Sequence, residues 1–197
     1  MRRHLAAIAV LATALPLPLA DPGMAAPSSC ETAMSVVQLA LPGPLPCRWL
    51  GKPAIVVARR TTLPMHSLRL TIVHLGTAHA FSMPGARARA NGVYAVVTVR
   101  VQNTTRAAAR VDGYAQTELT VGRVTYPYSS DTDFDPDGVV WRTAIPAGGS
   151  ATGDLLFDIP KSAIRAFPRE ANLLVLNFGQ DLQHRDATQF GIVDLTR

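Results

Sequence analysis

The residues with the clearest potential for chemistry form an acidic run in the second half of the chain. The carboxylates of this run, one at every second position, are Asp131, Asp133, Asp135 and Asp137. Carboxylate oxygens suit calcium, and alternate aspartates followed by a glycine resemble the first half of an EF-hand loop. Counted from Asp133, however, the twelfth position is Ala144, which cannot supply the bidentate carboxylate of that loop. The run is interpreted as a solvated acidic turn, with a calcium site as the weaker alternative.

Nucleophile and zinc motifs do not stand out from the sequence. Ser150 lies in Gly-Gly-Ser-Ala-Thr-Gly, which lacks the Gly-x-Ser-x-Gly order of a nucleophile elbow. The four histidines outside the N-terminal segment have neither the spacing nor the cysteine partners of a zinc site, and they are His66, His74, His79 and His184. The sequence therefore predicts a non-enzymatic protein without catalytic residues or a cofactor.

The N-terminus has the pattern of a secretory signal peptide. Two arginines precede an apolar stretch over residues 5–19, and small residues follow. Two prolines interrupt this stretch, which is shorter than the ~20 residues of a spanning helix. We expect a signal peptide over residues 1–25, with cleavage after Ala20 as the alternative, and no transmembrane helix in the mature chain. The expected location is secreted or associated with the cell envelope.

The two cysteines are interpreted from that location. Thiols outside the cytoplasm are usually oxidised, and Cys30 and Cys47 allow only one intramolecular pairing. A bridge between them would close a loop for which chain entropy predicts about 3 kcal/mol of stabilisation. No spacing motif favours a metal or redox pair instead. We expect a disulfide that fixes an N-terminal extension over residues 26–60.

The charge balance is mildly basic. The formal net charge is +5, and several arginines fall in segments that look like loops, namely Arg59, Arg60, Arg87, Arg89, Arg106 and Arg110. Basic residues interleaved with aromatic ones, as on nucleic-acid-binding surfaces, are missing. We therefore expect no nucleic-acid partner.

The elements that position these residues follow a period of two. Residues 68–72 alternate, with three aliphatic side chains on one face and Arg69 and Thr71 on the other. Residues 92–103 alternate more clearly, with valines on one face and Thr98, Arg100 and Gln102 on the opposite face. This alternation is typical of strands that have one side in water.

Further strands follow to the C-terminus. Residues 114–121 and 124–128 flank Gly122-Arg123, a two-residue loop that matches a type II′ hairpin. Strands are also expected over residues 54–58, 151–159, 173–178 and 190–195, with one helical turn over 161–167. Because no helical stripe could cover a sheet, two sheets must cover each other. We predict an all-β, immunoglobulin-like antiparallel β-sandwich of seven or eight strands over residues 61–197, with a closed barrel as the alternative.

Two segments, in their order along the chain, carry a pattern found in other proteins. Residues 91–105 read NGVYAVVTVRVQNTT, and residues 145–160 read IPAGGSATGDLLFDIP. This order resembles the bacterial telokin-like, immunoglobulin-like domains of exported proteins, including the secreted immunoprotective-antigen family. The resemblance implies a fold and supplies no catalytic residue.

Two further features have a structural and a functional interpretation. Asn103-Thr104-Thr105 has the form of a glycosylation acceptor, but we interpret Asn103 as a strand-ending structural residue. Four aromatic residues near the hairpin could form a patch for a partner, although core packing is favoured for at least two of them, and they are Tyr114, Tyr126, Tyr128 and Trp141.

The expected function is therefore that of a non-enzymatic extracytoplasmic binding module. Its partner would be another extracytoplasmic protein or an envelope component, contacted by loops between strands. The alternative is a calcium-dependent envelope module that uses the loop from Asp131 to Asp137.

Overall fold

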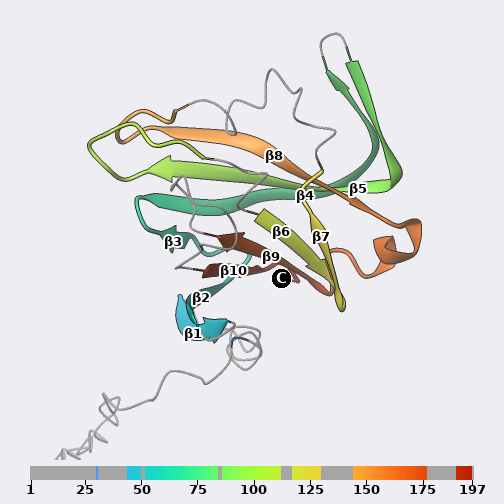
Figure 1. Cartoon of the computed structure of the whole chain (residues 1–197), viewed down its shortest axis with the longest axis horizontal. Helices are drawn as coiled ribbons and strands as arrows, with labels where there is room; N and C mark the ends of the chain where they lie inside the picture. Colours follow the sequence, from blue (N-terminus) through green and yellow to red (C-terminus); the bar gives the residue numbers. More distant parts are fainter. Residues whose placement is uncertain are drawn as a thin grey trace, which may run out of the picture.

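The structure is a computed structural model of the chain. It describes residue 30 and residues 44–49, 52–83, 86–111, 117–129, 144–176 and 190–196, with only the backbone described at 81–83 and 86–88. Within these ranges the chain forms ten strands and one short 3₁₀ helix (Figure 1). None of the helices in these ranges is long and apolar enough to cross a membrane.

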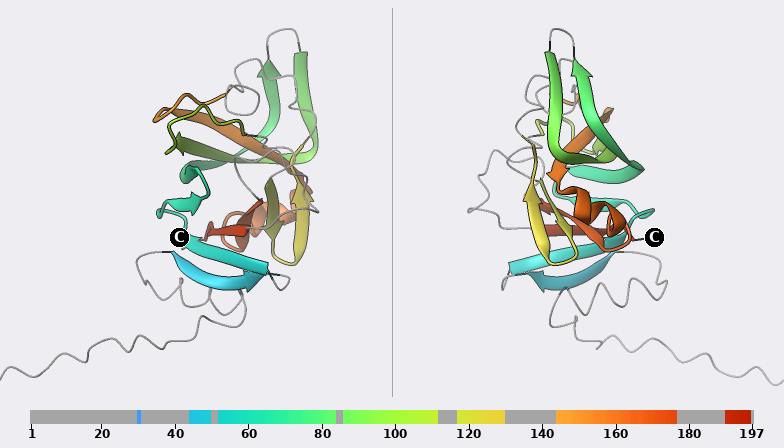
Figure 2. Two further views of the ribbon diagram at one scale, coloured as in Figure 1. Left: turned by 60° about the vertical axis from the view of Figure 1, so that its left-hand side comes forward. Right: turned by 90° about the vertical axis from the view of Figure 1, so that its right-hand side faces the viewer.

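One sheet has four antiparallel strands in the order β3-β4-β5-β8. Its strands are β3 (Leu63–Met65), β4 (Leu68–Met83), β5 (Ala86–Asn103) and β8 (Ser150–Ile159). The long hairpin of β4 and β5 forms the centre of this sheet, and its far end extends beyond the rest of the sandwich (Figures 1 and 2).

The other sheet has six strands in the order β1-β2-β10-β9-β6-β7. Its strands are β1 (Leu45–Trp49), β2 (Lys52–Ala58), β6 (Thr117–Val121), β7 (Val124–Pro127), β9 (Ala171–Leu176) and β10 (Phe190–Asp194). Strand β10 runs parallel to β2, whereas the other neighbouring pairs are antiparallel.

The core lies between the two sheets. Leu70 of β4, Val99 of β5 and Phe157 of β8 are fully buried on the inner face of the four-stranded sheet. Leu119 of β6 and Leu173 of β9 belong to the same cluster from the six-stranded sheet. Because alternate residues of each strand point inward, the side chains between them point to the outer faces.

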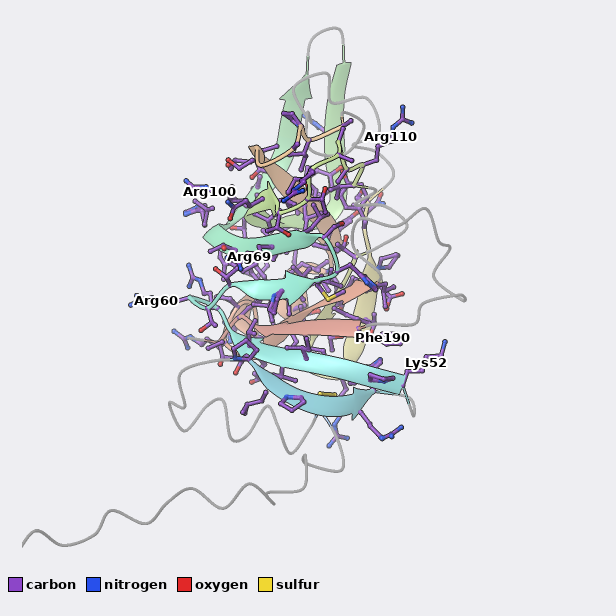
Figure 3. The ribbon with its side chains drawn as sticks, turned by 90° about the vertical axis from the view of Figure 1, so that its left-hand side faces the viewer. Lys52, Arg60, Arg69, Arg100, Arg110 and Phe190 are labelled. Atoms are coloured by element: carbon purple, nitrogen blue, oxygen red, sulfur yellow. A yellow bond between two sulfur atoms is a disulfide. The ribbon has the colours of Figure 1, made fainter. Side chains whose placement is uncertain are left out.

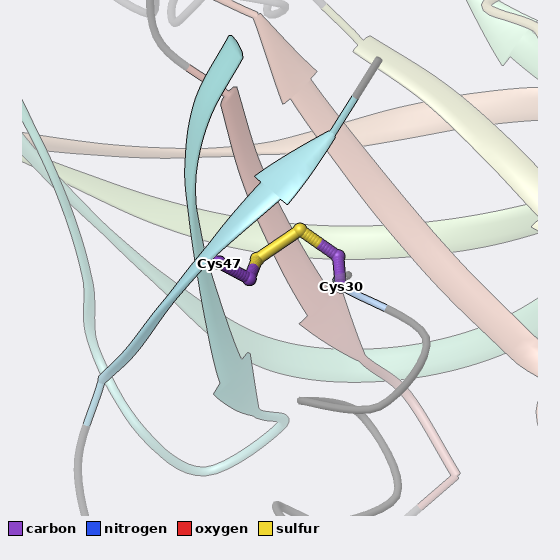
Figure 4. The surroundings of a disulfide bond; sticks show 2 residues. All are labelled: Cys30 and Cys47. Carbon is purple, nitrogen blue, oxygen red and sulfur yellow. A yellow bond between two sulfur atoms is a disulfide. The ribbon is translucent and has the colours of Figure 1, made fainter. Parts of the chain in front are cut away.

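A second apolar cluster surrounds the disulfide. Cys30 is bonded to Cys47 of β1, as the cysteine pattern predicts (Figure 4). Both cysteines are buried, together with Val56 of β2, Leu174 of β9 and Phe190 of β10. These residues alternate along their strands with the inward-pointing ones. The disulfide therefore holds Cys30 against the outer face of the six-stranded sheet.

The extended hairpin is anchored where β5 meets the end of β8. The carboxylate of Asp158 accepts hydrogen bonds from the backbone N–H groups of Asn91 and Gly92, at 2.7 and 3.0 Å. A Cβ atom at Gly92 would lie only 2.1 Å from the carbonyl oxygen of Ile159. Glycine is therefore required at this close approach of two backbones.

The predicted all-β sandwich is confirmed, with three differences in detail. The described residues form ten strands, where the sequence predicts seven or eight, and the two additional strands, β1 and β3, are short and each contains a proline. One strand pair, β2 with β10, is parallel, whereas the sequence predicts antiparallel pairs throughout. Both β1 and β2 lie within the six-stranded sheet, so the segment predicted as an extension to residue 60 supplies two strands of the sandwich.

The predicted local elements agree closely with the structure. Gly122 has a φ of +61° and Arg123 does not have a positive φ, as a type II′ turn between β6 and β7 requires. The predicted helical turn is the 3₁₀ helix η2 (Lys161–Arg165). Arg87 and Arg89, predicted in loops, lie instead in β5.

Candidate functional site

The candidate site lies on the outer face of the four-stranded sheet. The register of β4 and β5 places Arg69 opposite Gln102 and Thr71 opposite Arg100. The two arginines are therefore diagonal neighbours on one face, within reach of each other's long side chains. Both arginines are exposed, whereas Leu70 beside Arg69 is fully buried in the core. The rigid centre of the sandwich thus presents two guanidinium groups to solvent.

Strand β3 supplies the wall of this site. A two-residue turn, His66-Ser67, joins Met65 of β3 to Leu68 of β4, and His66 has a φ of +45°. This turn sets the β3 register, which brings Pro64 opposite Arg69. Two residues along the chain from each member of this pair, Thr62 and Thr71 form a hydrogen bond, with their hydroxyl oxygens 2.9 Å apart.

Together these residues form a groove of about 390 Å³. The described residues that line it are Thr62, Pro64, Arg69, Thr71, Arg100 and Gln102. Arg60, in the turn after β2, lies on the same side of the molecule as Arg69 and Arg100 (Figure 3). This side of the molecule therefore carries a third exposed arginine, which is not among the groove's lining residues.

The groove has a positive electrostatic character. Among the described residues that line it, none is acidic, and Arg69 and Arg100 make no ion pair with any residue in the described part of the chain. The nearest acid in the sheet register is Asp154, which pairs with Thr98 and is a diagonal neighbour of Arg100 on the side away from β4. Asp154 accepts a hydrogen bond of 2.6 Å from the Thr98 hydroxyl.

The chemistry available in the groove is that of binding. Guanidinium groups, an amide and threonine hydroxyls donate hydrogen bonds, and the two arginines add positive charge. None of these side chains is a general base or an activated nucleophile. The arrangement suits recognition of an anionic, oxygen-rich group.

Asn103, at the end of β5, is a structural residue, in agreement with its interpretation from the sequence. It is fully buried, and its amide nitrogen donates to the carbonyl oxygens of Ala107, Ile145 and Pro146. Its side-chain oxygen accepts hydrogen bonds from the backbone N–H and the hydroxyl of Thr105. The amide is thus occupied and buried, which leaves no access for a glycan.

The acidic run predicted as a turn or calcium site, Asp131 to Asp137, lies outside the described residues. Ser150 begins β8 opposite Gln102, which cannot act as a base. His66, His74 and His79 lie in or beside β4, and His184 is outside the described residues. Within the described ranges, no three residues among His, Cys, Asp and Glu are grouped so as to hold a metal ion.

Two of the four hairpin aromatics can be located. Tyr128 is buried, and its ring meets that of Phe157 edge-on, with centroids 6.2 Å apart. Tyr126 is partly buried and packs against the same core. Core packing of both is therefore confirmed, while Tyr114 and Trp141 lie outside the described residues.

The groove itself was not predicted, although its signal is present in the sequence. The alternation already places Arg69 and Thr71 on one face of their strand, and Arg100 and Gln102 on one face of theirs. The sequence does not reveal the β4–β5 register, which places these two faces side by side.

The comparison with protein families decides the relationship. Residues 67–166, half of the chain, match the family described as "Domain of unknown function (DUF4352)". The chain belongs to the DUF4352 family. The matched DUF4352 segment includes β4, β5 and β8 and thus both groove arginines. The match does not extend to the telokin-like or immunoprotective-antigen families that the order of motifs resembles.

Solved structures of low sequence identity resemble the DUF4352 chain. The yjhA protein from Bacillus subtilis is 12% identical, with coverage of 67% of this chain and 94% of that protein, at a TM-score of 0.48. An uncharacterised β-sandwich protein from Clostridium difficile 630 is 12% identical, with coverage of 70% and 91%, at a TM-score of 0.46. No curated protein matches the chain.

Proposed function

We propose that this DUF4352 protein is a non-enzymatic extracytoplasmic binding module. Its partner is an envelope component or another extracytoplasmic protein, held on the outer face of the four-stranded sheet. The single observation that carries this proposal is the groove between β3, β4 and β5, where Arg69 and Arg100 stand exposed beside neutral donors.

Two other features support the proposal. Disulfides persist in oxidising compartments, so the bridge from Cys30 to Cys47 favours a location outside the cytoplasm. The groove is built on paired strands rather than on loops, and rigid elements lose little entropy when a ligand binds. A secreted or envelope-associated scaffold with a preformed binding face accounts for both features.

Blocking the groove without a change of charge tests the proposal. Gln102 is exposed in β5 at the floor of the groove, so a Gln102→Trp variant fills the groove and leaves the core intact. Thr125→Trp, an exposed position in β7 of the other sheet, is the matched control. We expect the wild type and the control to co-sediment with the envelope fraction of the producing cell, and Gln102→Trp to remain soluble. Equal sedimentation of all three proteins would contradict the proposal.

A further inference from the structure

The donors around the groove differ in kind and come from three strands or their flanks. Thr62 lies on the β3 side, Arg69 and Thr71 lie on β4, and Arg100 lies on β5, whereas Pro64 contributes only apolar surface. A ligand in the groove can therefore accept hydrogen bonds from several directions. A planar carboxylate is satisfied by the fork of a single arginine, whereas a tetrahedral group presents oxygens in several directions.

The threonine pair leaves one donor for a ligand. The hydroxyl of Thr62 or that of Thr71 donates the hydrogen bond between them, and either direction is compatible with the geometry. Whichever hydroxyl accepts, its own proton remains free to point elsewhere. Beside it, Arg100 lies directly opposite Thr71. When Thr71 holds that proton, a hydroxyl donor and a guanidinium donor are direct neighbours, and when Thr62 holds it, the hydroxyl donor lies on the other side of Thr71.

From these observations we infer that the groove is a binding site for a tetrahedral oxyanion of the phosphate class. Arg69 and Arg100 bind the group from two strands, and the hydroxyl of the threonine pair and the amide of Gln102 supply neutral donors. The inference rests on the proposed function and specifies its ligand. The phosphate is either a free anion or a group carried on a polymer, and Arg60 on the same side favours a ligand that continues past the groove (Figure 3).

Replacement of arginine by lysine distinguishes bidentate hydrogen bonding to the anion from electrostatic attraction alone. Lysine keeps the positive charge but loses the planar fork of donors. Arg69 and Arg100 are exposed on the outer face, so their replacement leaves the core unchanged. Arg123, exposed in the turn between β6 and β7, is the control.

The test is a titration of the oxidised, ¹⁵N-labelled protein at constant ionic strength, followed through the arginine Nε–H resonances. The probes are inorganic phosphate, linear tripolyphosphate and succinate. We expect the resonances of Arg69 and Arg100 to shift with phosphate or tripolyphosphate. We also expect Arg69→Lys and Arg100→Lys to weaken that binding by about tenfold, the loss of one charged hydrogen bond, and Arg123→Lys to leave it unchanged.

Each outcome decides the inference. Shifts with inorganic phosphate identify a site for single phosphate groups, and shifts with tripolyphosphate alone identify a site for polymer-borne phosphate. Equal affinity in the lysine variants would overturn the site and leave only diffuse attraction, as would stronger binding of succinate or no shift at either arginine. These failures differ from failure of the proposed function, because envelope binding blocked by Gln102→Trp does not depend on the chemical class of the ligand.

Discussion

The amide nitrogen of Asn103 donates a hydrogen bond of 3.0 Å to the carbonyl oxygen of Ile145, and it ties the end of β5 to the segment that leads into β8. The same nitrogen also contacts the carbonyl oxygens of Ala107 and Pro146. One side chain thus holds two loops at the end of the sheet that carries the groove.

Replacement of Asn103 by alanine should therefore destabilise the protein. The change removes all the hydrogen bonds of a fully buried amide, to three carbonyl oxygens and from Thr105, and we expect the free energy of unfolding to fall by about 3 kcal/mol. Urea unfolding of the oxidised protein measures the change. Gln102→Ala, at the neighbouring exposed position, should stay within about 0.5 kcal/mol of wild type. Equal stability of the two variants would show that the Asn103 hydrogen bonds contribute little to the free energy of unfolding.

Gly92→Ala should also destabilise the protein, for a steric reason. The new Cβ atom would lie 2.1 Å from the carbonyl oxygen of Ile159, a backbone atom that cannot rotate away. We expect a loss of about 3 kcal/mol, near the upper end of overpacking effects. At Gly76 the new Cβ would meet only the flexible end of His74, at 3.1 Å. The Gly76→Ala variant should therefore unfold at nearly the wild-type urea concentration, and a similar loss in both variants would be inconsistent with this packing.

The bridge between Cys30 and Cys47 should be present in the exported protein and should stabilise it. The two residues are 17 apart in sequence, and a loop of that size is worth about 3 kcal/mol in the chain-entropy account. The Cys30→Ser, Cys47→Ser double variant should unfold at a correspondingly lower urea concentration. Labelling of both thiols in the untreated wild-type protein would refute the bridge.

Calcium should leave the thermal unfolding of the protein unchanged. The acidic run has Ala144 where an EF-hand loop needs its last carboxylate. A native-state ligand at about 100 times its dissociation constant adds roughly 2.7 kcal/mol, which corresponds to several degrees in Tm. We therefore expect the same Tm in excess calcium and in chelator. A rise in Tm that is lost in the Asp133→Asn, Asp135→Asn variant would establish the metal site instead.

Most of the strands could be predicted because their signals are local. The valine alternation of β5 and the Gly122 turn each depend on a few neighbouring residues, and both are found as expected. Strand β1 could not be predicted, because the run Leu-Pro-Cys-Arg-Trp forms a strand only by pairing with β2 at the edge of the sheet.

The groove could be predicted only in part. The outward positions of Arg69 and Arg100 follow from the alternation of each strand. Their proximity follows from the β4–β5 register, which a bulge between Ile72 and His74 shifts within the same hairpin. A one-residue change of register would move one arginine into the core, so the pairing decides whether a site exists.

Removal of both groove arginines tests the central claim most directly. The measurement is the dissociation constant for the envelope fraction, compared between Arg69→Ala, Arg100→Ala and a control with the same loss of charge, Arg123→Ala, Arg165→Ala, at exposed positions elsewhere. We predict that the groove variant binds at least about tenfold more weakly than the control. The groove variant loses charged hydrogen bonds to the ligand, whereas the control loses only long-range electrostatic attraction, which salt screens. Equal affinity of the two double variants would contradict a binding site on this face of the sandwich.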